Sequence, residues 1–228
     1  MNEDNKIKVL IADDHRLFRE GLIKVLEKHP DISIIGEAGD GEELLKKYFE
    51  LKPDIIVVDI SMPVLSGIDA AKKIKEIDES AKILFLSMYF SEEYIYTCFK
   101  AGGSGLVSKN ILEDELVDAI KKVHAGEKYF GKEYTEVKLN QLVHQYNSVY
   151  ITEFKNKKPP LSKRELEVLK LVGDGCTSAD ISNKLFIDIR TVDSHRTKIM
   201  HKLNLKSLSE FIKHAVEYNM FLENQDEQ

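Results

Sequence analysis

The first 125 residues alternate short apolar runs with amphipathic stretches, and this alternation limits the possible folds more than any other feature. The apolar runs are rich in Ile, Val and Leu, and they predict five β-strands. The strands are Ile7–Ala12, Ile32–Ala38, Ile55–Asp59, Ile83–Ser87 and Gly105–Ser108. Strands that are apolar almost throughout and alternate with helices favour a parallel sheet covered on both faces. We therefore predict an α/β domain at residues 1–128, with a doubly wound, flavodoxin-like, parallel five-stranded sheet.

The amphipathic stretches predict the helices that cover this sheet. They are Leu17–Leu26, Glu42–Leu51, Ile68–Ile77, Glu92–Ala101 and Leu112–Ala125. Asp40 and Ser91 each precede a helix whose first turn holds acidic residues, so both are expected to cap a helix N-terminus. Gly126 is expected to end the last of these helices.

The chain changes character after residue 128. Residues 129–160 predict a linker that is helical in part and ends in the polar run Asn156–Pro160. Over residues 161–228, Ser162, Thr177 and Ser207 each stand three residues before an acid, which is the pattern of a capping box. Asp188 could cap a further helix. We therefore predict a small all-α domain of four helices at residues 161–228.

Charge is distributed unevenly along the chain. Residues 1–154 hold 20 basic and 28 acidic side chains, whereas residues 155–214 hold 13 basic and 7 acidic ones. A basic C-terminal half suggests an anionic partner, although chance variation in surface charge could also produce such a split.

The sequence predicts a cytoplasmic protein that does not bind membranes. No apolar run approaches the ~20 residues that a bilayer-spanning helix needs. The N-terminus is polar and then acidic, unlike a secretory signal. Cys98 and Cys176 lie far apart and are expected to be reduced packing residues.

Polar side chains stand at the carboxyl ends of four predicted strands: Asp13, Asp14, Asp59, Ser87 and Lys109. In an open parallel sheet these ends meet at one edge, where ligands bind. Three carboxylates close together require a hard cation, and Mg²⁺ fits. A lysine and a hydroxyl suit the oxygens of a phosphoryl group, and a carboxylate can accept that group as a nucleophile. Turn chemistry could explain one aspartate pair but not five polar groups at the ends of four strands.

Four of these residues, Asp13, Asp14, Asp59 and Lys109, belong to segments that resemble the receiver domains of NarL/FixJ-type two-component response regulators. The segments are Asp13–Leu22, Asp59–Pro63 with Gly67, and Ala101–Lys109. The resemblance implies that a histidine kinase phosphorylates Asp59 in a Mg²⁺-dependent reaction.

The resemblance also implies a role for each group around Asp59. Asp14 would bind Mg²⁺ directly and Asp13 mostly through water, while Ser61 would offer its backbone carbonyl to the metal. Ser87 and Lys109 would engage the phosphoryl oxygens.

Two positions depart from the receiver pattern. Leu106 stands where an aromatic switch residue is usual, and Asn110 stands where a proline, often cis, usually follows the lysine. We therefore expect a looser switch, in which Ser87 and the packing of Leu106 carry the response to phosphorylation.

Residues 161–216 resemble a LuxR-type helix-turn-helix domain through Glu165–Leu169, Ile181–Leu185 and Thr191–Arg196. The third helix would present a buried face with Val192, Ile199, Met200 and Leu203, and a polar face that enters the major groove of double-stranded DNA. The candidate DNA contacts are Arg190, Asp193, Ser194, Thr197, Lys198, His201 and Lys202.

Within this polar face the residue types predict different tasks. Lys198 and Lys202 would hold phosphates, whereas Asp193, Ser194 and Thr197 would lie closest to the base edges. Asp193 replaces a lysine common at that position, and it could accept from a cytosine amino group or complement the helix N-terminus.

Two further expectations concern packing and assembly. His195 is expected to pack or to form hydrogen bonds within the domain rather than to contact a base. The last helix, Leu208–Tyr218, carries an apolar stripe at Phe211, Ile212 and Ala215. By resemblance, this helix would form a homodimer contact, with the receiver as a second route.

Together these features predict a phosphorylation-controlled transcription factor that promotes only its own phosphotransfer and dephosphorylation. One alternative is a Mg²⁺-dependent phosphatase or phosphotransferase. Such enzymes generally carry a second acid just after the nucleophile, whereas Ser61 and Met62 follow Asp59 here. The other alternative is a helical domain that binds protein instead of DNA.

Overall fold

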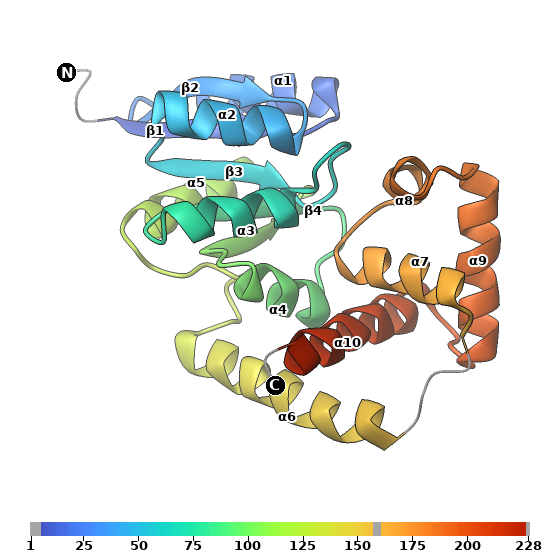
Figure 1. The fold of residues 1–228 in the computed structure, drawn as a ribbon. Coiled ribbons are helices and arrows are strands. Elements are labelled where there is room, and N and C mark those ends of the chain that lie inside the picture. The colour runs from blue at the N-terminus through green and yellow to red at the C-terminus, as the bar shows by residue number, and fades with distance from the viewer. Residues whose placement is uncertain (1–5, 157–160, 227–228) are drawn as a thin grey trace. The chain divides into compact units, whose positions relative to one another are not determined.

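The computed structural model describes residues 6–156 and 161–226. The chain divides into two compact units, Met1–Glu136 and Val137–Gln228 (Figure 1). Among the described helices, none combines the length and apolar character that crossing a membrane requires. Cys98 and Cys176 are both buried, and neither forms a disulfide, as predicted.

The first unit contains a parallel five-stranded sheet in the order β2-β1-β3-β4-β5. This order confirms the predicted flavodoxin-like topology. The strands have the predicted bounds: β1 (Ile7–Ala12), β2 (Ile32–Ala38), β3 (Ile55–Asp59), β4 (Ile83–Ser87) and β5 (Gly105–Ser108). Every residue of β3 and β4 is buried, which explains why these segments are apolar almost from end to end.

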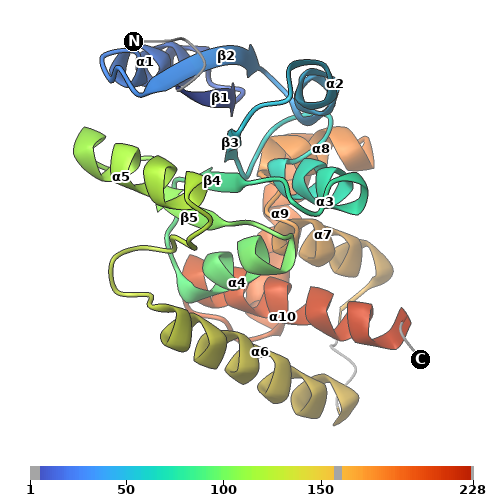
Figure 2. The same cartoon turned by 90° about the vertical axis from the view of Figure 1, so that its left-hand side faces the viewer.

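Helices cover both faces of this sheet. They are α1 (Arg16–Leu26), α2 (Gly41–Leu51), α3 (Gly67–Ile77), α4 (Glu92–Lys100) and α5 (Glu113–His124). Figure 2 shows α1 and α5 on one face and α2 and α3 on the other. A core cluster fills the space between the sheet and the first pair, with Leu26 and Ile120 fully buried.

The helix ends test the predicted caps. The Asp40 side chain accepts a hydrogen bond from the Glu43 N–H at 2.8 Å, as expected for an N-cap. Ser91 occupies the N-cap position of α4, but its side chain makes no capping hydrogen bond, so that prediction holds for position only. Gly126 follows α5 with φ +91°, a conformation that favours glycine.

The first unit continues past residue 128, where the sequence predicted its end. The Leu106 N–H donates to the Tyr129 carbonyl at 2.9 Å, and the Tyr129 N–H donates to the Ser104 carbonyl at 3.0 Å. Phe130 is also buried. These bonds fix the chain along the outer edge of β5 before it enters the next helix.

The second unit is helical. Its elements are α6 (Glu136–Asn156), α7 (Lys163–Gly173), α8 (Ser178–Leu185), α9 (Ile189–Lys202) and α10 (Leu208–Asp226). The predicted linker therefore contains a 21-residue helix. The run Asn156–Pro160 lies outside the described residues except for Asn156. The last helix extends eight residues beyond its predicted end at Tyr218.

Short local bonds fix the starts of α7, α8 and α9. Ser162 with Glu165, and Thr177 with Asp180, form reciprocal capping boxes. Asp188 accepts from the Arg190 N–H at 2.8 Å, which confirms it as the N-cap of α9.

The start of α10 follows the capping pattern only in part. Ser207 accepts a hydrogen bond from the Glu210 N–H, as in a capping box. The Glu210 carboxylate, however, bonds to the N–H of Lys206 instead of returning to Ser207.

The contact of α10 with α7 corrects the predicted dimer stripe. A Cβ added to Gly173 of α7 would lie 2.4 Å from the Ala215 carbonyl, so the two helices approach closely. Phe211 and Ala215 are fully buried, and Ile212 is nearly so. The apolar stripe therefore belongs to the packing of the chain itself and is not available to a second copy.

Candidate functional sites

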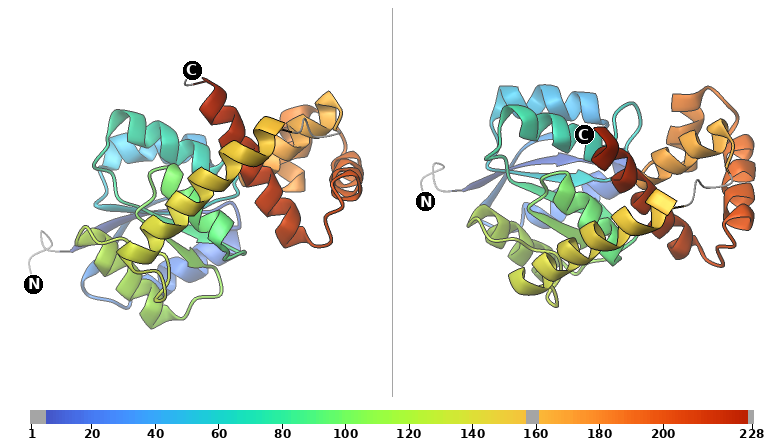
Figure 3. Two further views of the ribbon diagram at one scale, coloured as in Figure 1. Left: turned by 90° about the horizontal axis from the view of Figure 1, so that it is seen from below. Right: turned by 60° about the horizontal axis from the view of Figure 1, so that its bottom comes forward.

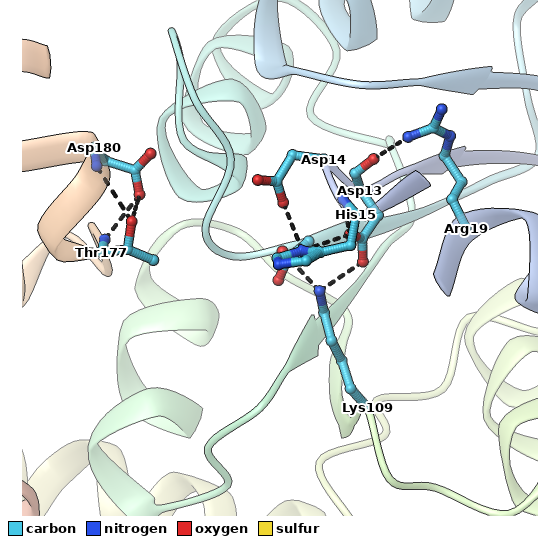
Figure 4. A network of polar contacts seen from close by, with 8 residues as sticks. Asp13, Asp14, His15, Arg19, Lys109, Thr177 and Asp180 are labelled. Atoms are coloured by element: carbon cyan, nitrogen blue, oxygen red, sulfur yellow. Dashed lines mark hydrogen bonds and ion pairs between the residues drawn. The ribbon is translucent and has the colours of Figure 1, made fainter. Parts of the chain in front are cut away.

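The sheet topology brings two aspartates and a lysine together at the carboxyl ends of the strands. Asp13 directly follows β1, and Asp59 ends the adjacent strand β3. The Lys109 ammonium, which comes from the residue after β5, lies 2.6 Å from Asp13 Oδ2 and 2.8 Å from Asp59 Oδ2. Figure 4 shows Lys109 extending to this group. Residues 96 positions apart in the sequence thus meet in one cluster, as predicted.

Burial destabilises the charged forms of the acidic side chains in this cluster. Asp13 has no exposed surface, and Asp59 is 4% exposed. Loss of solvation raises the pKa of Asp59 to about 7; Lys109 opposes this rise, and the neighbouring charge of Asp13 adds to it. For Lys109, burial opposes its charge, but Asp59 and Asp13 outweigh burial and raise its pKa. An additional cation would therefore favour the ionised form of Asp59.

Asp14 and His15 complete the cluster on its exposed side. His15 Nδ1 lies 2.9 Å from Asp14 Oδ1 and 3.3 Å from Asp13 Oδ1 (Figure 4). One ligand atom each from Asp13, Asp14, His15 and Asp59 falls within 4.8 Å of all the others. Sequence reasoning missed His15, although its position directly after the aspartate pair was an available signal. The three carboxylates fit a hard divalent cation.

Ser87 and Ser61 lie next to this cluster. Ser87 is buried, and its Oγ accepts a hydrogen bond from the Tyr89 N–H at 3.0 Å. The Lys109 N–H donates to the Ser87 carbonyl at 2.8 Å, so the ends of β4 and β5 are held together. The Ser61 N–H donates to the Asp59 carboxylate. The expected role of the Ser61 carbonyl as a metal ligand remains a prediction.

The loop after Asp59 requires glycine at position 67. A Cβ at this position would lie 1.9 Å from the Asp59 carbonyl oxygen. The Gly67 N–H donates to the Ile60 carbonyl at 2.9 Å, so the start of α3 packs directly against the backbone at the end of β3. Any larger residue at position 67 would displace Asp59.

Leu106 lies fully buried on β5, paired with Phe85 of β4. A pocket of about 340 Å³ lies beside it; its lining includes Phe90, Tyr129 and Gly131. Leu106 is already buried and carries no polar group. It therefore cannot replace an aromatic side chain whose hydroxyl moves between an outward and an inward position.

The raised pKa of Asp59 predicts a pH-dependent stability. The folded carboxyl keeps its proton up to about pH 7, whereas the unfolded one loses it near 3.8, so the free energy of unfolding should fall between these values as pH rises. An asparagine side chain cannot ionise, so Asp59→Asn should abolish this fall in the free energy of unfolding. We expect the metal-free variant to melt roughly 5 °C above the parent at pH 8, and the difference to shrink towards pH 5.

The matched control is Asp114→Asn, because Asp114 is an exposed acid in the first turn of α5. It should keep the pH dependence of the parent in thermal melts. If the melting temperatures of the parent and Asp59→Asn change equally with pH across pH 5–8, the buried-carboxyl explanation is ruled out.

In the second unit, α9 presents the predicted polar face. Val192 and Ile199 are fully buried, whereas Met200 and Leu203 are half-buried. Figure 3 shows α9 along one border of the helical unit. All seven candidate DNA contacts have exposed side chains: Arg190, Asp193, Ser194, Thr197, Lys198, His201 and Lys202.

Contacts within the unit already engage three of these seven residues. Asp193 Oδ1 accepts from the Ser178 hydroxyl at 2.7 Å, so it joins α9 to the start of α8. The Thr197 hydroxyl donates to the Asp193 carbonyl at 3.0 Å. Lys202 Nζ donates to Glu165 Oε2 at 2.7 Å. Sequence patterns did not indicate these partners, and the base-reading role of Asp193 and Thr197 remains a prediction.

Four exposed residues keep their polar groups available. Within the described part of the chain, no side-chain hydrogen bond or ion pair engages Arg190, Ser194, Lys198 or His201. His195 is half-buried, and its buried Nδ1 has no hydrogen-bond partner among the described residues, which agrees with a packing role.

The Lys202–Glu165 pair predicts that Lys202 and Lys198, both on α9, contribute differently to the stability of the unit. Glu165 is buried, and the hydrogen bond from Lys202, with that from the Ser162 N–H, lowers its pKa to about 2. Lys202→Ala should lower the stability of the unit by about 1 kcal/mol at pH 7, because a buried carboxylate loses its cation. Lys198→Ala should leave stability unchanged.

Thermal melts at pH 7 and pH 3 would measure this difference. Protonation of Glu165 as pH falls from 4.5 towards 2 removes the contribution of the pair, so the stability difference between the parent and Lys202→Ala should be smaller at pH 3 than at pH 7. Equal stability of parent and Lys202→Ala at pH 7 would contradict the pairing.

Family comparisons match both units. Residues 9–121 match the response regulator receiver domain, and residues 159–215 match the bacterial regulatory proteins of the luxR family. The chain is 38% identical over 211 residues to the oxygen regulatory protein NreC of Staphylococcus epidermidis RP62A, covering 92% of this chain and 97% of that relative.

Solved structures agree with this assignment. RcsB of Salmonella enterica serovar Typhimurium, bound to the promoter rprA in the presence of the phosphomimetic BeF3⁻, is 25% identical with a TM-score of 0.55, covering 93% of this chain and 99% of that one. A structure of two RcsB dimers on two parallel DNAs is 25% identical with a TM-score of 0.54, covering 96% and 98%. The chain therefore belongs to the response regulators, transcription regulators that join a phosphorylation-controlled receiver domain to a luxR-family DNA-binding domain.

Proposed function

We propose that Asp59 is the phosphoacceptor of this regulator and that a sensor histidine kinase supplies the phosphoryl group. The observation that carries the proposal is the contact of Lys109 with both Asp59 and Asp13 at the strand ends. An Asp59 oxygen would attack phosphorus while the phosphorus–nitrogen bond of a phosphohistidine breaks, and the imidazole would keep the electron pair and take a proton. Lys109 already lies where it can hold a phosphoryl oxygen.

Asp13, Asp14, Asp59 and the Ser61 carbonyl would hold Mg²⁺ in this pocket. Receiver domains generally bind Mg²⁺ at an acidic pocket, and the all-oxygen donor set here fits a hard cation. A bound Mg²⁺ neutralises charge on the carboxylates and on the phosphoryl oxygens. The same carboxylates would orient water for the slow loss of the phosphoryl group, so the chain would catalyse only its own phosphorylation and dephosphorylation.

The structural change caused by phosphorylation would pass from the phosphorylation pocket to the loop between β4 and α4. If the Ser87 hydroxyl turns to a phosphoryl oxygen, it releases the Tyr89 N–H that it now accepts from. The next residue, Phe90, packs edge-on against Tyr134 with ring centres 6.5 Å apart. A Cβ at Gly131 would lie 3.0 Å from the Phe90 ring. Tyr134 stands two residues before α6, so these contacts connect the pocket to the segment that leads to the DNA-binding unit.

Phe90→Ala should therefore weaken the coupling between phosphorylation and DNA binding. We expect normal labelling of Asp59 but at least a threefold smaller increase in DNA affinity on phosphorylation, measured by fluorescence anisotropy. The control is Phe49→Ala, since Phe49 is 41% exposed against 38% for Phe90 but lies on α2. An unchanged increase in Phe90→Ala would exclude this route.

The luxR-family unit would bind double-stranded DNA through α9, as a homodimer in the cytoplasm. RcsB, which is similar over both units, binds DNA as a dimer in a solved structure. Of the seven candidate contacts on α9, Ser194, Lys198, Arg190 and His201 have polar side-chain groups that no described contact engages. The contact between copies would involve exposed parts of α10 or of the receiver, because the apolar stripe is buried within the chain.

Selection of DNA sites by the BeF3⁻-treated protein would test this function. We expect recovery of sites with two related half-sites about one helical turn apart. Failure to enrich any DNA sequence, with retained binding of a protein partner, would favour a protein-binding helical domain. Turnover of small phosphate esters would favour an enzyme.

A further inference from the structure

We propose that Arg19 is a positioning residue for the Mg²⁺ site and acts through the peptide group between Asp13 and Asp14. Glu37 would fix the guanidinium of Arg19, and the guanidinium would fix that peptide group. Arg19 would contact neither the cation nor the phosphoryl group. This proposal rests on the proposed function, because it concerns the pocket in which Asp59 would be phosphorylated.

The Arg19 side chain reaches the backbone of the pocket from α1. Its Nη1 donates a hydrogen bond to the Asp13 carbonyl, as Figure 4 shows. This carbonyl belongs to the peptide group that joins Asp13 to Asp14, and a peptide group is planar and rigid. The direction of the carbonyl therefore sets the direction in which the chain enters Asp14, one of the carboxylates that would hold Mg²⁺.

The other polar groups of Asp13 have partners elsewhere in the first unit. Its N–H donates to the Ala38 carbonyl at 3.1 Å, and its Oδ1 accepts from the His15 N–H at 2.8 Å. Its Oδ2 lies 2.6 Å from the Lys109 ammonium. Arg19 thus holds the one remaining polar group of this buried residue, its backbone carbonyl.

Arg19 is itself held in place by β2. Its Nε donates to Glu37 Oε2 at 2.7 Å, and only 13% of its side chain is exposed. Glu37 pairs with Ile11 of β1, two residues before Asp13, so the sheet sets where this carboxylate lies relative to the pocket. Lys47 Nζ also donates to the Glu37 carbonyl at 2.5 Å. A guanidinium is a planar fork of donors, so it can hold two acceptors in a fixed geometry, whereas a lysine ammonium on its flexible stem cannot.

The charge of Arg19 makes a positioning role distinguishable from an electrostatic one. A positive charge beside the pocket opposes the binding of a cation. Removal of Arg19 also leaves the negative charge of Glu37 without its partner. A purely electrostatic role therefore predicts tighter Mg²⁺ binding when Arg19 is lost, whereas a positioning role predicts weaker binding.

Titration of the full chain with MgCl₂, followed by NMR through the amide signals of the pocket, tests the proposal without a phosphoryl donor. Arg19→Ala should weaken Mg²⁺ binding roughly tenfold, as is typical when a group that orients a metal ligand is removed. Arg19→Lys keeps the charge and one donor, so its Mg²⁺ affinity should lie between those of the parent and Arg19→Ala.

The matched control is Arg16→Ala. Arg16 also lies on α1, and its Nε also donates to a carboxylate, that of Glu20, at 2.7 Å. Its side chain is 81% exposed, however, and this pair lies outside the pocket. Arg16→Ala should change the Mg²⁺ affinity less than twofold.

Labelling of Asp59 by acetyl phosphate gives a second readout. Arg19→Ala should need roughly ten times more Mg²⁺ to reach half of its maximal labelling rate, but its rate at saturating Mg²⁺ should equal that of the parent. Partial unfolding of the variant would instead lower the maximal rate and leave the Mg²⁺ requirement unchanged.

Unchanged or tighter Mg²⁺ binding in Arg19→Ala, or an equal loss in Arg16→Ala, would overturn the proposal. A lower maximal labelling rate with an unchanged Mg²⁺ requirement would also overturn it, because Arg19 would then serve only the stability of the unit. Mg²⁺ binding by the parent without labelling of Asp59 would contradict the proposed phosphoacceptor, whereas the titration alone decides the role of Arg19.

Discussion

Asp59→Asn should abolish phosphorylation of this chain. With acetyl phosphate or the cognate kinase and Mg²⁺, the parent should gain one phosphoryl group by intact mass, and the variant none. The amide has no anionic oxygen to attack phosphorus, and the other carboxylates of the pocket, Asp13 and Asp14, belong to the metal. Removal of Mg²⁺ with a chelator should also stop labelling of the parent, since the buried carboxylates repel one another and the phosphoryl group.

Two variants control this experiment. Asp114→Asn should label like the parent, because Asp114 is exposed in the first turn of α5 and is not one of the pocket residues. Lys109→Ala should still accept a phosphoryl group but fail to pass the change to DNA binding, because the lysine would hold the phosphoryl oxygen. Full labelling of Asp59→Asn would remove Asp59 from its proposed role.

Substitutions on α9 should divide into two kinds. Lys198→Ala should weaken binding to a selected site and to random DNA alike and flatten the salt dependence by about one unit, because a phosphate contact is lost. Ser194→Ala should cost ~1–3 kcal/mol on the selected site only, because a base contact is lost. Fluorescence anisotropy on both DNAs across a salt series would separate the two effects.

Lys213→Ala is the matched control for charge, since Lys213 is an exposed lysine on α10. It should change neither affinity nor salt slope. Equal losses on both DNAs for Ser194→Ala would show that α9 does not read the sequence through this residue. Lys202→Ala is a poor probe of DNA contact, because the substitution also removes the cation from the buried Glu165 carboxylate.

The fold was predictable because its signals are local. The strands β3 and β4 are apolar almost from end to end and buried on both faces, so their bounds follow from composition alone. The capping boxes at Ser162 and Thr177 join residues three positions apart, and both formed as predicted. The cluster of Asp13, Asp59 and Lys109 followed from one topological rule, that parallel strands end at the same edge.

The predictions that were wrong or remained incomplete depended on distant contacts. Lys202 and Glu165 are 37 residues apart, and nothing in either segment shows that they pair. The apolar stripe at Phe211 is equally compatible with packing inside the chain and with a dimer contact, and only the close approach at Gly173 decides for the former. The continuation of the first unit past residue 128 depends on backbone bonds of Tyr129 to the edge of β5, which side-chain patterns do not reveal.

The most direct test of this account is the DNA affinity of the full chain with and without BeF3⁻ and Mg²⁺, measured on a selected site. We predict that BeF3⁻ raises the affinity of the parent at least tenfold and leaves that of Asp59→Asn unchanged. The same affinity for the parent in both conditions, or the same rise in Asp59→Asn, would contradict control of DNA binding through Asp59.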